Sequence, residues 1–238
     1  MQGHARPKIT YLGHSTVRLD LAEGQVVVID PWVDTNPACP AASKDLGRLD
    51  AILITHGHSD HMNDAVALAR RYRPEAVVCN WEIGVWLQSQ GVANVRQMNT
   101  GGTQDVMGLA VTMVRADHSS TIQDGDRVVN GGNPAGYVVR LPSGYTLYHA
   151  GDTALFSDMQ LIAELWRPEL AFLPIGDLFT MDPQQAARAC RYLGVRRVIP
   201  VHWGTFPMLT GTPEALRLAL DDIGVKCEVL AMKPGESW

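Results

Sequence analysis

The most informative segment of this chain is Thr55-His56-Gly57-His58-Ser59-Asp60-His61. It follows the apolar run Ala51-Ile52-Leu53-Ile54 and precedes a helical pattern at Asn63 to Tyr72, which places three imidazoles and a carboxylate on one strand-to-helix loop. Neutral imidazole nitrogens and carboxylate oxygens suit Zn²⁺ and related divalent ions. Because the chain has only 8 histidines in 238 residues, chance clustering is a poor explanation. We therefore predict a metal-binding loop rather than a polar surface turn.

Further metal-competent side chains recur just beyond other predicted strands. They are His118 after Leu109 to Val114, Asp152 after Tyr145 to Tyr148, and His202 after Val198 to Val201. A lone histidine at a strand end is usually structural, but loops at one edge of a layered sheet fold are where functional sites gather. The joint pattern therefore predicts that these three residues join His56, His58, Asp60 and His61.

The chain alternates short runs rich in β-branched residues with helical patterns, which predicts sheets inside and helices outside in one domain over residues 1–238. The remaining predicted strands are Val26 to Ile29, Ala76 to Val78, Gly136 to Leu141, Leu170 to Leu173 and Cys227 to Leu230. The remaining predicted helices are Trp81 to Gln90, Ser157 to Trp166, Pro183 to Leu193 and Pro213 to Ile223. Asp182, Thr212 and Ser157 are the expected helix caps. Residues 118–134 read as a long irregular loop.

Composition excludes several classes of protein. Hydrophobic residues make up 46% of the chain, enough for a sizeable core, and the net charge of −5 with no long Lys/Arg run gives no reason to expect a nucleic-acid partner. No run approaches the ~20 apolar residues that span a bilayer, and no signal peptide is evident. We expect a cytoplasmic protein with a small-molecule substrate, reduced cysteines, no membrane partner and possible homo-oligomers.

These motifs resemble the metallo-β-lactamase superfamily, through His56-x-His58-x-Asp60-His61 followed by His118, Asp152 and His202. More narrowly, the chain resembles a branch of uncharacterised metal-dependent hydrolases related to L-ascorbate 6-phosphate lactonases. The segments that carry this closer resemblance are Gly13-His14-Ser15, Asp30-Pro31-Trp32, His118-Ser119-Ser120, His149-Ala150-Gly151-Asp152-Thr153, Gly176 to Asp182, and His202 to Pro207. The resemblance implies an α/β fold, a four-layer αββα sandwich of two mixed β-sheets flanked by helices.

The resemblance also implies a ligand set for two divalent metal ions. His56, His58 and His118 would bind the first ion; Asp60, His61 and His202 would bind the second; Asp152 would bridge them. Asp30 would support a ligating imidazole from behind. Zn²⁺ is the ion we expect most, while Mn²⁺, Fe and Ni²⁺ also fit such ligands.

The function implied is a dinuclear hydrolase that uses a metal-bridging hydroxide on a small ester, lactone or phosphodiester. Phosphodiesterase activity in place of lactonase activity is one alternative, and a non-hydrolytic diiron redox or metal-binding protein is another. Asp60 is the candidate for holding the nucleophile. His14 is either a supporting acid, a substrate contact or a hydrogen-bonded structural residue.

Weaker candidates surround this set. His149 reads as a structural or supporting residue, and Asp177 could face the site or belong to a simple turn. Thr205 and Phe206 could contact substrate or pack their own loop. Trp32 neighbours a proposed site segment and is a candidate pocket residue.

Overall fold

The computed structural model describes residues 5–238, which form two large mixed β-sheets. The first sheet has the strand order β1 (Lys8–Gly13), β2 (Thr16–Asp20), β3 (Val26–Ile29), β4 (Ala51–Leu53), β5 (Ala76–Asn80) and β6 (Val95–Met98). The second has the order β15 (Glu228–Val229), β14 (Arg197–Val201), β13 (Leu170–Pro174), β12 (Thr146–His149), β11 (Ala135–Arg140), β8 (Leu109–Arg115) and β7 (Thr103–Val106). Each sheet joins antiparallel strands to a parallel run, which makes both sheets mixed.

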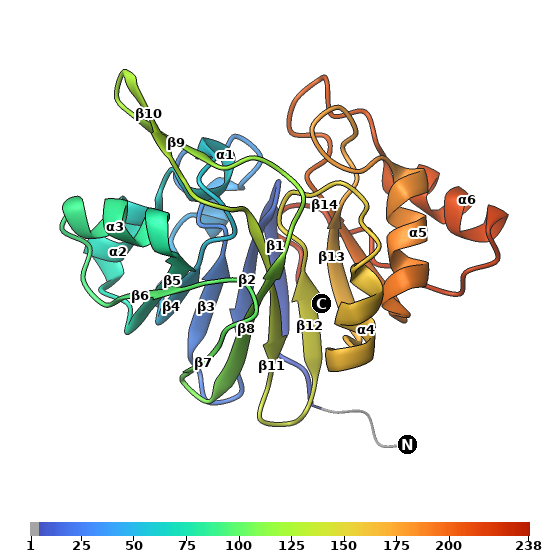
Figure 1. The fold of residues 1–238 in the computed structure, drawn as a ribbon, viewed down its shortest axis with the longest axis horizontal. Helices are drawn as coiled ribbons and strands as arrows, with labels where there is room; N and C mark the ends of the chain where they lie inside the picture. Colours follow the sequence, from blue (N-terminus) through green and yellow to red (C-terminus); the bar gives the residue numbers. More distant parts are fainter. Residues whose placement is uncertain (1–4) are drawn as a thin grey trace.

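Helices cover the outer face of each sheet (Figure 1). They are α1 (Ser59–Met62), α2 (Ala65–Tyr72), α3 (Trp81–Ser89), α4 (Met159–Trp166), α5 (Pro183–Leu193) and α6 (Pro213–Asp222), with a short 3-10 turn at Ala41–Ser43. One apolar core lies between the sheets, and each sheet has one further core between its outer face and its helices. The four-layer αββα sandwich predicted from the sequence is therefore confirmed.

The directions of the strands bring their carboxyl ends to one edge of the sandwich. In the first sheet β3, β4 and β5 are parallel, and in the second β12, β13 and β14 are parallel. β1 and β3 are both antiparallel to β2, so they run in the same direction. β8 and β12 are both antiparallel to β11, so they also run in the same direction. The segments that carry the candidate ligands follow β4, β8, β12 and β14, so they all leave the sheets at this edge.

Hydrogen bonds join the two sheets at the same edge. The backbone N–H of Ala135 donates to Thr55 O at 3.0 Å, and the Tyr137 hydroxyl donates to Ile54 O at 2.9 Å. The backbone N–H of His202 donates to His14 O at 2.7 Å. Because these groups are buried and would otherwise lack partners, the bonds fix the distance between loops that belong to different sheets.

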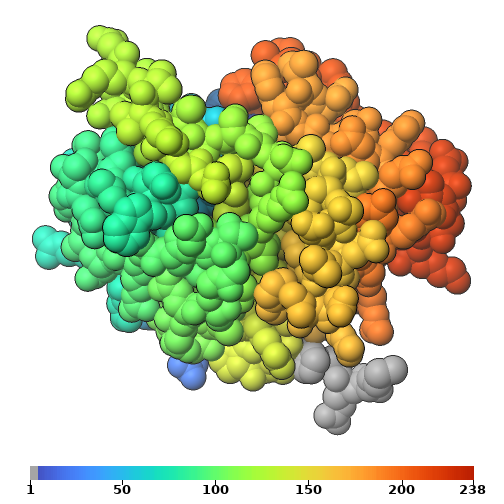
Figure 2. Space-filling model, viewed as in Figure 1, coloured from blue at the N-terminus to red at the C-terminus, as the bar shows by residue number. Residues whose placement is uncertain are grey.

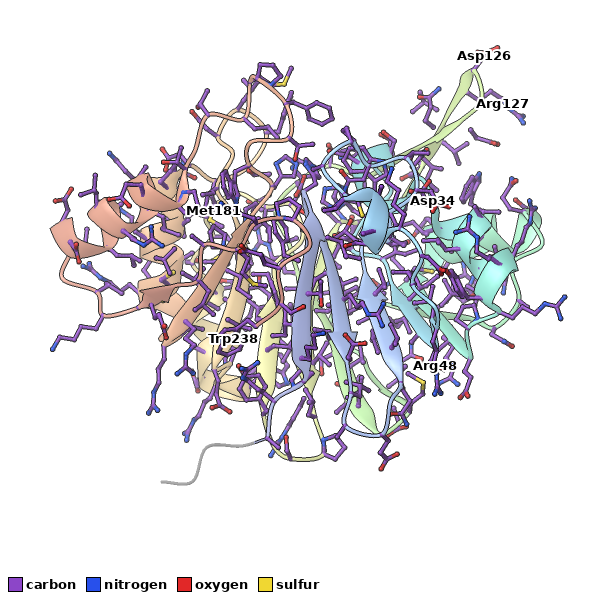
Figure 3. The ribbon with its side chains drawn as sticks, turned by 180° about the vertical axis from the view of Figure 1, so that it is seen from behind. Asp34, Arg48, Asp126, Arg127, Met181 and Trp238 are labelled. Atoms are coloured by element: carbon purple, nitrogen blue, oxygen red, sulfur yellow. The ribbon has the colours of Figure 1, made fainter. Side chains whose placement is uncertain are left out.

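The segment from His118 to Pro134 differs from its prediction as an irregular loop. It contains the antiparallel hairpin of β9 (Thr121–Asp124) and β10 (Arg127–Asn130). The hairpin projects from the edge of the sandwich and carries Asp126 and Arg127 at its tip (Figure 3). Its strands are short and their side chains are mostly exposed, so neither the length nor the hydrophobicity of a buried strand marked them in the sequence.

The helix starts agree with the sequence at two of three positions. Asp182 Oδ1 accepts from Gln185 N at 2.7 Å and Thr212 Oγ1 accepts from Ala215 N at 3.1 Å, as their predicted cap roles require. The expected cap Ser157 is wrong, because α4 begins after Asp158. Among the helices of residues 5–238, none combines the length and the apolar character that crossing a bilayer requires.

Replacing the cap of α5 should destabilise the fold. Asp182→Ala removes the acceptor for the Gln185 N–H, and we expect the free energy of unfolding to fall by about 1 kcal/mol in chemical denaturation. Ser157→Ala is the matched control, because the Ser157 hydroxyl contacts only the neighbouring Asp158 carboxylate and caps no helix. Equal losses in the two variants would contradict the cap assignment.

Candidate metal centre

Left-handed backbone turns aim several side chains at the edge of the sandwich. His14, Asp30 and His202 have φ angles of 58°, 53° and 55°. Residues with a Cβ adopt this region at a cost, and such conformations cluster at functional sites. Each of the three follows a strand, so the turn redirects the chain where regular pairing stops.

Three imidazoles form the first group of the centre. His56, His58 and His118 each offer a ring nitrogen, and these atoms all lie within 4.8 Å of one another. His56 Nε2 lies 3.0 Å from His58 Nδ1. His56 is fully buried while His58 and His118 are partly exposed. The structure therefore brings together the three residues that the resemblance implies for one ion.

The second group combines His14, Asp60, His61 and His202, whose ligand atoms also lie within 4.8 Å of one another. His14 Nε2 is 3.0 Å and His202 Nε2 is 3.7 Å from Asp60 Oδ2. Asp60 and His61 both lie in α1, whereas His202 directly follows β14. His14 is an addition to the set implied by the resemblance.

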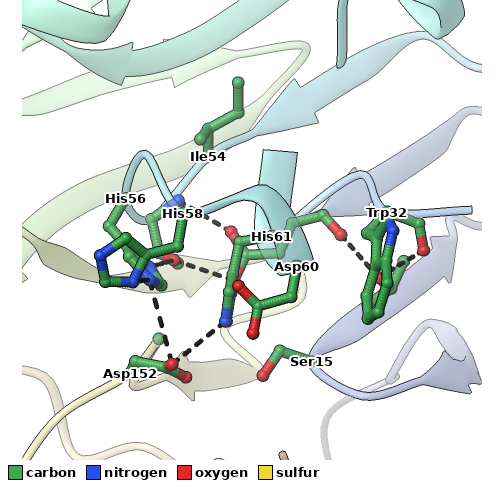
Figure 4. Close-up of polar contacts among 12 residues, drawn as sticks. Ser15, Trp32, Ile54, His56, His58, Asp60, His61 and Asp152 are labelled. Carbon is green, nitrogen blue, oxygen red and sulfur yellow. Dashed lines mark hydrogen bonds and ion pairs between the residues drawn. The ribbon is translucent and has the colours of Figure 1, made fainter. Parts of the chain in front are cut away.

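Asp152 lies between the two groups (Figure 4). Its Oδ2 is 2.9 Å from the Nε2 of His202, 3.2 Å from that of His61, 3.7 Å from that of His118 and 3.9 Å from that of His56. The carboxylate is 2% exposed. One oxygen thus faces imidazoles of both groups, which is the position a bridging ligand would occupy.

The charge at this centre needs a cation. Asp30, Asp60 and Asp152 form no ion pair with Lys or Arg among residues 5–238. The Oδ1 of Asp152 and the Nε2 of His61 are buried without a hydrogen-bond partner. A buried carboxylate is costly unless it is paired or coordinates a metal. Buried carboxylate and imidazole atoms that lack partners within the protein therefore fit divalent ions.

The pKa values divide the histidines by their surroundings. Burial lowers the pKa of His56 well below its ordinary value, and it lowers the pKa values of His58 and His118 too. Burial acts in the same direction on His202, but the Asp152 carboxylate outweighs it and raises the pKa of His202 to about 9. His56, His58 and His118 are therefore neutral and offer lone pairs to a metal ion. Beside His202, the Asp152 carboxylate makes positive charge most favourable.

Asp30 supports histidines of both groups from behind. Its carboxylate accepts from His61 Nδ1 at 2.8 Å, from Thr55 N at 2.8 Å and from the Thr55 hydroxyl at 2.9 Å. Since the Thr55 hydroxyl gives its proton to Asp30, its oxygen accepts from His56 Nδ1 at 3.0 Å. The Nδ1 atoms of both rings are held by these contacts, which turns the Nε2 atom of each ring towards Asp152. The carboxylates of Asp152 and Asp30 outweigh burial and raise the pKa of His61 well above its ordinary value, so a cation is favoured at this nitrogen.

His14 and Thr205 form a second support, beside Asp60. His14 is fully buried, with Nε2 on Asp60 Oδ2 and Nδ1 3.0 Å from Thr205 Oγ1. Burial lowers the pKa of His14 to about 4. A neutral ring has one donor and one acceptor. Nε2–H therefore donates to Asp60 and Nδ1 accepts from the Thr205 hydroxyl. This geometry favours the hydrogen-bonded role over the supporting acid.

Two of the weaker candidates lie outside the group of ligands. His149 accepts from Gly151 N at 3.1 Å and donates to Ser15 O at 3.0 Å, so both its ring nitrogens bind backbone. It shapes the turn before Asp152 rather than facing the ions. Asp177 is exposed with a φ of 66°, in a turn where its carbonyl accepts from Phe179 N and Thr180 N. No contact joins its carboxylate to the centre.

Sequence reasoning missed two hydroxyls that position the histidine loop. Thr55 links Asp30 to His56, as described above. The Ser120 hydroxyl accepts from Gly57 N at 3.1 Å and donates to Gly131 O at 2.9 Å, tying the histidine loop to the hairpin segment. A hydroxyl directly before a ligand at a strand end is a signal that could have marked Thr55. Ser120 acts across 63 positions of sequence, and only the fold reveals it.

Comparison with known proteins gives the family. The profile of the family described as beta-lactamase superfamily domain matches residues 25–203. The chain belongs to this superfamily. Proteins named UPF0173 metal-dependent hydrolase are similar to it over nearly their whole length. That of Koribacter versatilis is 54% identical, covering 97% of both chains, and that of Methanopyrus kandleri is 45% identical, covering 97% of this chain and 99% of its own.

A solved structure agrees with the superfamily assignment. Igni18, described as a novel metallo hydrolase from Ignicoccus hospitalis, has a TM-score of 0.86 and 35% identity, with 98% of this chain and 97% of Igni18 covered. The predicted superfamily and fold are both confirmed, and the metal-dependent hydrolase branch is consistent with these relatives. The relation to ascorbate 6-phosphate lactonases stays a prediction.

Removing the carboxylate behind His61 and Thr55 should weaken metal binding. Asp30→Asn replaces an acceptor by a group that cannot accept from all three donors, so we expect metal affinity to fall about 10- to 100-fold in chelator competition. Asp34→Asn is the control, because Asp34 lies in the same segment but pairs with the exposed Arg71. Unchanged affinity in a folded Asp30→Asn protein would contradict the supporting role.

Proposed function

We propose that this protein is a dinuclear hydrolase whose two divalent ions share Asp152. The observation that carries the proposal is the placement of Asp152 Oδ2 within 3.9 Å of Nε2 atoms from both groups of ligands. The broader class is already shown, because the superfamily match and the nearly full-length relatives named metal-dependent hydrolases confirm the enzyme class that the sequence predicts.

The residues divide between the ions as follows. His56, His58 and His118 would hold one ion, while Asp60, His61 and His202 would hold the other, with Asp152 common to both. If bound there, two divalent ions would supply a water of lowered pKa and would polarise the oxygen of the scissile group. Zn²⁺ suits this nitrogen-rich set, and Mn²⁺, Fe or Ni²⁺ remain compatible with it.

Asp60 is both partly exposed to solvent and in contact with His14. Its side chain is 27% exposed, the largest fraction among the carboxylates of the centre, so it is the acid that a substrate or water reaches first. The donation from His14 Nε2 holds Oδ2, and Thr205 holds His14 in turn. In this arrangement Asp60 orients the attacking water, and His14 positions Asp60.

The reaction proposed is hydrolysis of a small ester, lactone or phosphodiester. For an ester, the oxygen of water bonds to the acyl carbon, the acyl C–O bond breaks, and the departing alkoxide takes up a proton derived from water. Phosphodiester cleavage is the rival activity, since paired ions can also hold the attacking and leaving oxygens of an in-line displacement. A diiron redox protein is the alternative of another class.

Metal content and turnover test the proposal together. We expect about two equivalents of divalent metal per chain, with hydrolysis of p-nitrophenyl acetate or bis(p-nitrophenyl) phosphate. His58→Ala removes a ligand of the first group only, so metal should fall to about one equivalent. Mutating a residue that hydrogen-bonds to a metal ligand lowers activity by up to roughly 100-fold. Removing the ligand His58 itself should lower activity by more than this.

The exposed Asp126→Asn at the hairpin tip is the control, which should keep both metal and activity. A metal-replete protein that binds no ion would overturn the proposal. Bound iron with a visible absorption band and no turnover of any substrate would favour the redox alternative instead.

A further inference from the structure

Exposed apolar side chains gather on the two loops that adjoin the second group of ligands. Between β13 and α5, Leu178 is 66% and Phe179 is 56% exposed. Between β14 and α6, Phe206 is 37% and Met208 is 48% exposed. Single exposed apolar residues are common, whereas several on neighbouring loops beside a site point to a ligand surface. We call these four residues and Trp32 the apolar rim.

The two loops are joined at their bases, so the rim is one surface. Thr210 N donates to Gly176 O at 3.0 Å. A side chain at Gly176 would collide with His202 O, and one at Gly211 would collide with Ile175 O, so backbone packs directly on backbone. Both loops rise above the edge of the sandwich, apart from the β9–β10 hairpin on the other side (Figures 1 and 2).

The inner end of the rim reaches the candidate centre. Phe206 stacks with Trp32 at 6.1 Å between ring centroids, with an interplanar angle of 27°. The same two rings meet His14, at 5.9 Å from Phe206 and 5.2 Å from Trp32. Because His14 contacts Asp60, an apolar group lying on this aromatic pair would place its polar end next to the ligands.

The turn that presents Leu178 and Phe179 is strained. Asp177 and Leu178 both have positive φ angles, of 66° and 45°. A residue with a Cβ atom pays a free-energy cost at positive φ, and glycine would avoid this cost. Such strained conformations cluster at functional sites. Leu178 contributes nothing to the core, since its side chain is mostly in solvent. We therefore infer that the Leu178 side chain serves binding rather than folding stability.

Basic side chains are missing from the segments that build the centre and the rim. Residues 13–16, 30–38, 55–64, 116–121, 151–158, 175–182 and 202–212 contain no Lys or Arg. Arg115, next along the chain, pairs with Asp158 at 3.0 Å. Sites that recognise phosphate or carboxylate groups usually supply Arg or Lys to do so. An anionic substrate would find no Lys or Arg on these segments to offset its charge.

We propose that the apolar rim binds the hydrocarbon part of an uncharged substrate, so that the preferred substrate is a neutral ester or lactone with an apolar acyl group rather than an anionic phosphodiester. The proposal rests on the proposed hydrolytic function and narrows it. Burying a methylene group on such a surface strengthens binding by at most about fourfold. Selectivity should therefore grow with acyl length until the rim is covered.

The direct test is a series of p-nitrophenyl esters from acetate to octanoate, measured beside bis(p-nitrophenyl) phosphate on the metal-loaded full chain. We expect kcat/KM to rise about two- to fourfold per methylene over the first additions, and every ester longer than butyrate to exceed the phosphodiester. A flat series, or a phosphodiester preferred over all esters, would overturn the rim proposal while leaving the hydrolase intact.

A pair of double variants tests whether the rim itself is responsible. Leu178→Asn with Phe179→Asn should lower the octanoate-to-acetate ratio of kcat/KM about tenfold, and asparagine tolerates the positive φ at position 178. Leu161→Asn with Leu165→Asn is the matched control, because both leucines are exposed on α4 away from the site. Equal ratios in the two double variants would contradict the proposal.

A binding measurement separates failure of the rim from failure of the hydrolytic function. Octanamide is neutral and carries the same acyl chain, so its affinity for the metal-free protein can be measured by calorimetry. We expect the rim variant to weaken octanamide binding about tenfold relative to the Leu161/Leu165 control. If the metal-loaded protein hydrolyses nothing, the proposed function fails, yet this comparison still decides whether the rim takes an apolar acyl group.

Discussion

The carboxylate of Asp152 is the constraint on which the centre depends. It is 2% exposed, has no Lys or Arg partner among residues 5–238, and faces four imidazoles from three different segments of the chain. Burying such a charge costs several kcal/mol unless a cation compensates it. The imidazoles can supply positive charge only by holding protons, which removes their lone pairs. Divalent ions satisfy the carboxylate and the imidazoles at once.

The fold makes this arrangement possible by joining two sheets at one edge. His56 and His61 leave the first sheet, whereas Asp152 and His202 leave the second, so any sliding of the sheets would pull the ligands apart. The buried bonds from Ala135 N to Thr55 O and from His202 N to His14 O prevent that movement. Asp30 then orients His56 and His61 from behind, through contacts that belong to the first sheet alone.

The sequence predicts those features of the structure that neighbouring residues encode, and it misses those that depend on contacts between distant residues. Buried parallel strands read as continuous apolar runs, so the ends of β4, β12 and β14 and the ligands beyond them could be recognised. The β9–β10 hairpin could not, because its strands are short and exposed. The resemblance implied that Asp30 supports one imidazole, but its second contact, through Thr55 to His56, was not predicted. The hydrogen bond from Gly57 N to the Ser120 hydroxyl joins distant positions, and no local pattern encodes it.

The most direct test of the shared carboxylate is crystallographic. Crystals grown with Zn²⁺ and measured at the zinc absorption edge would show the anomalous density of each bound ion. Two ions about 3.5–4 Å apart, both in contact with Asp152, are the predicted result. One ion held away from Asp152, or no ion near the histidine loop under metal-replete conditions, would contradict the dinuclear centre.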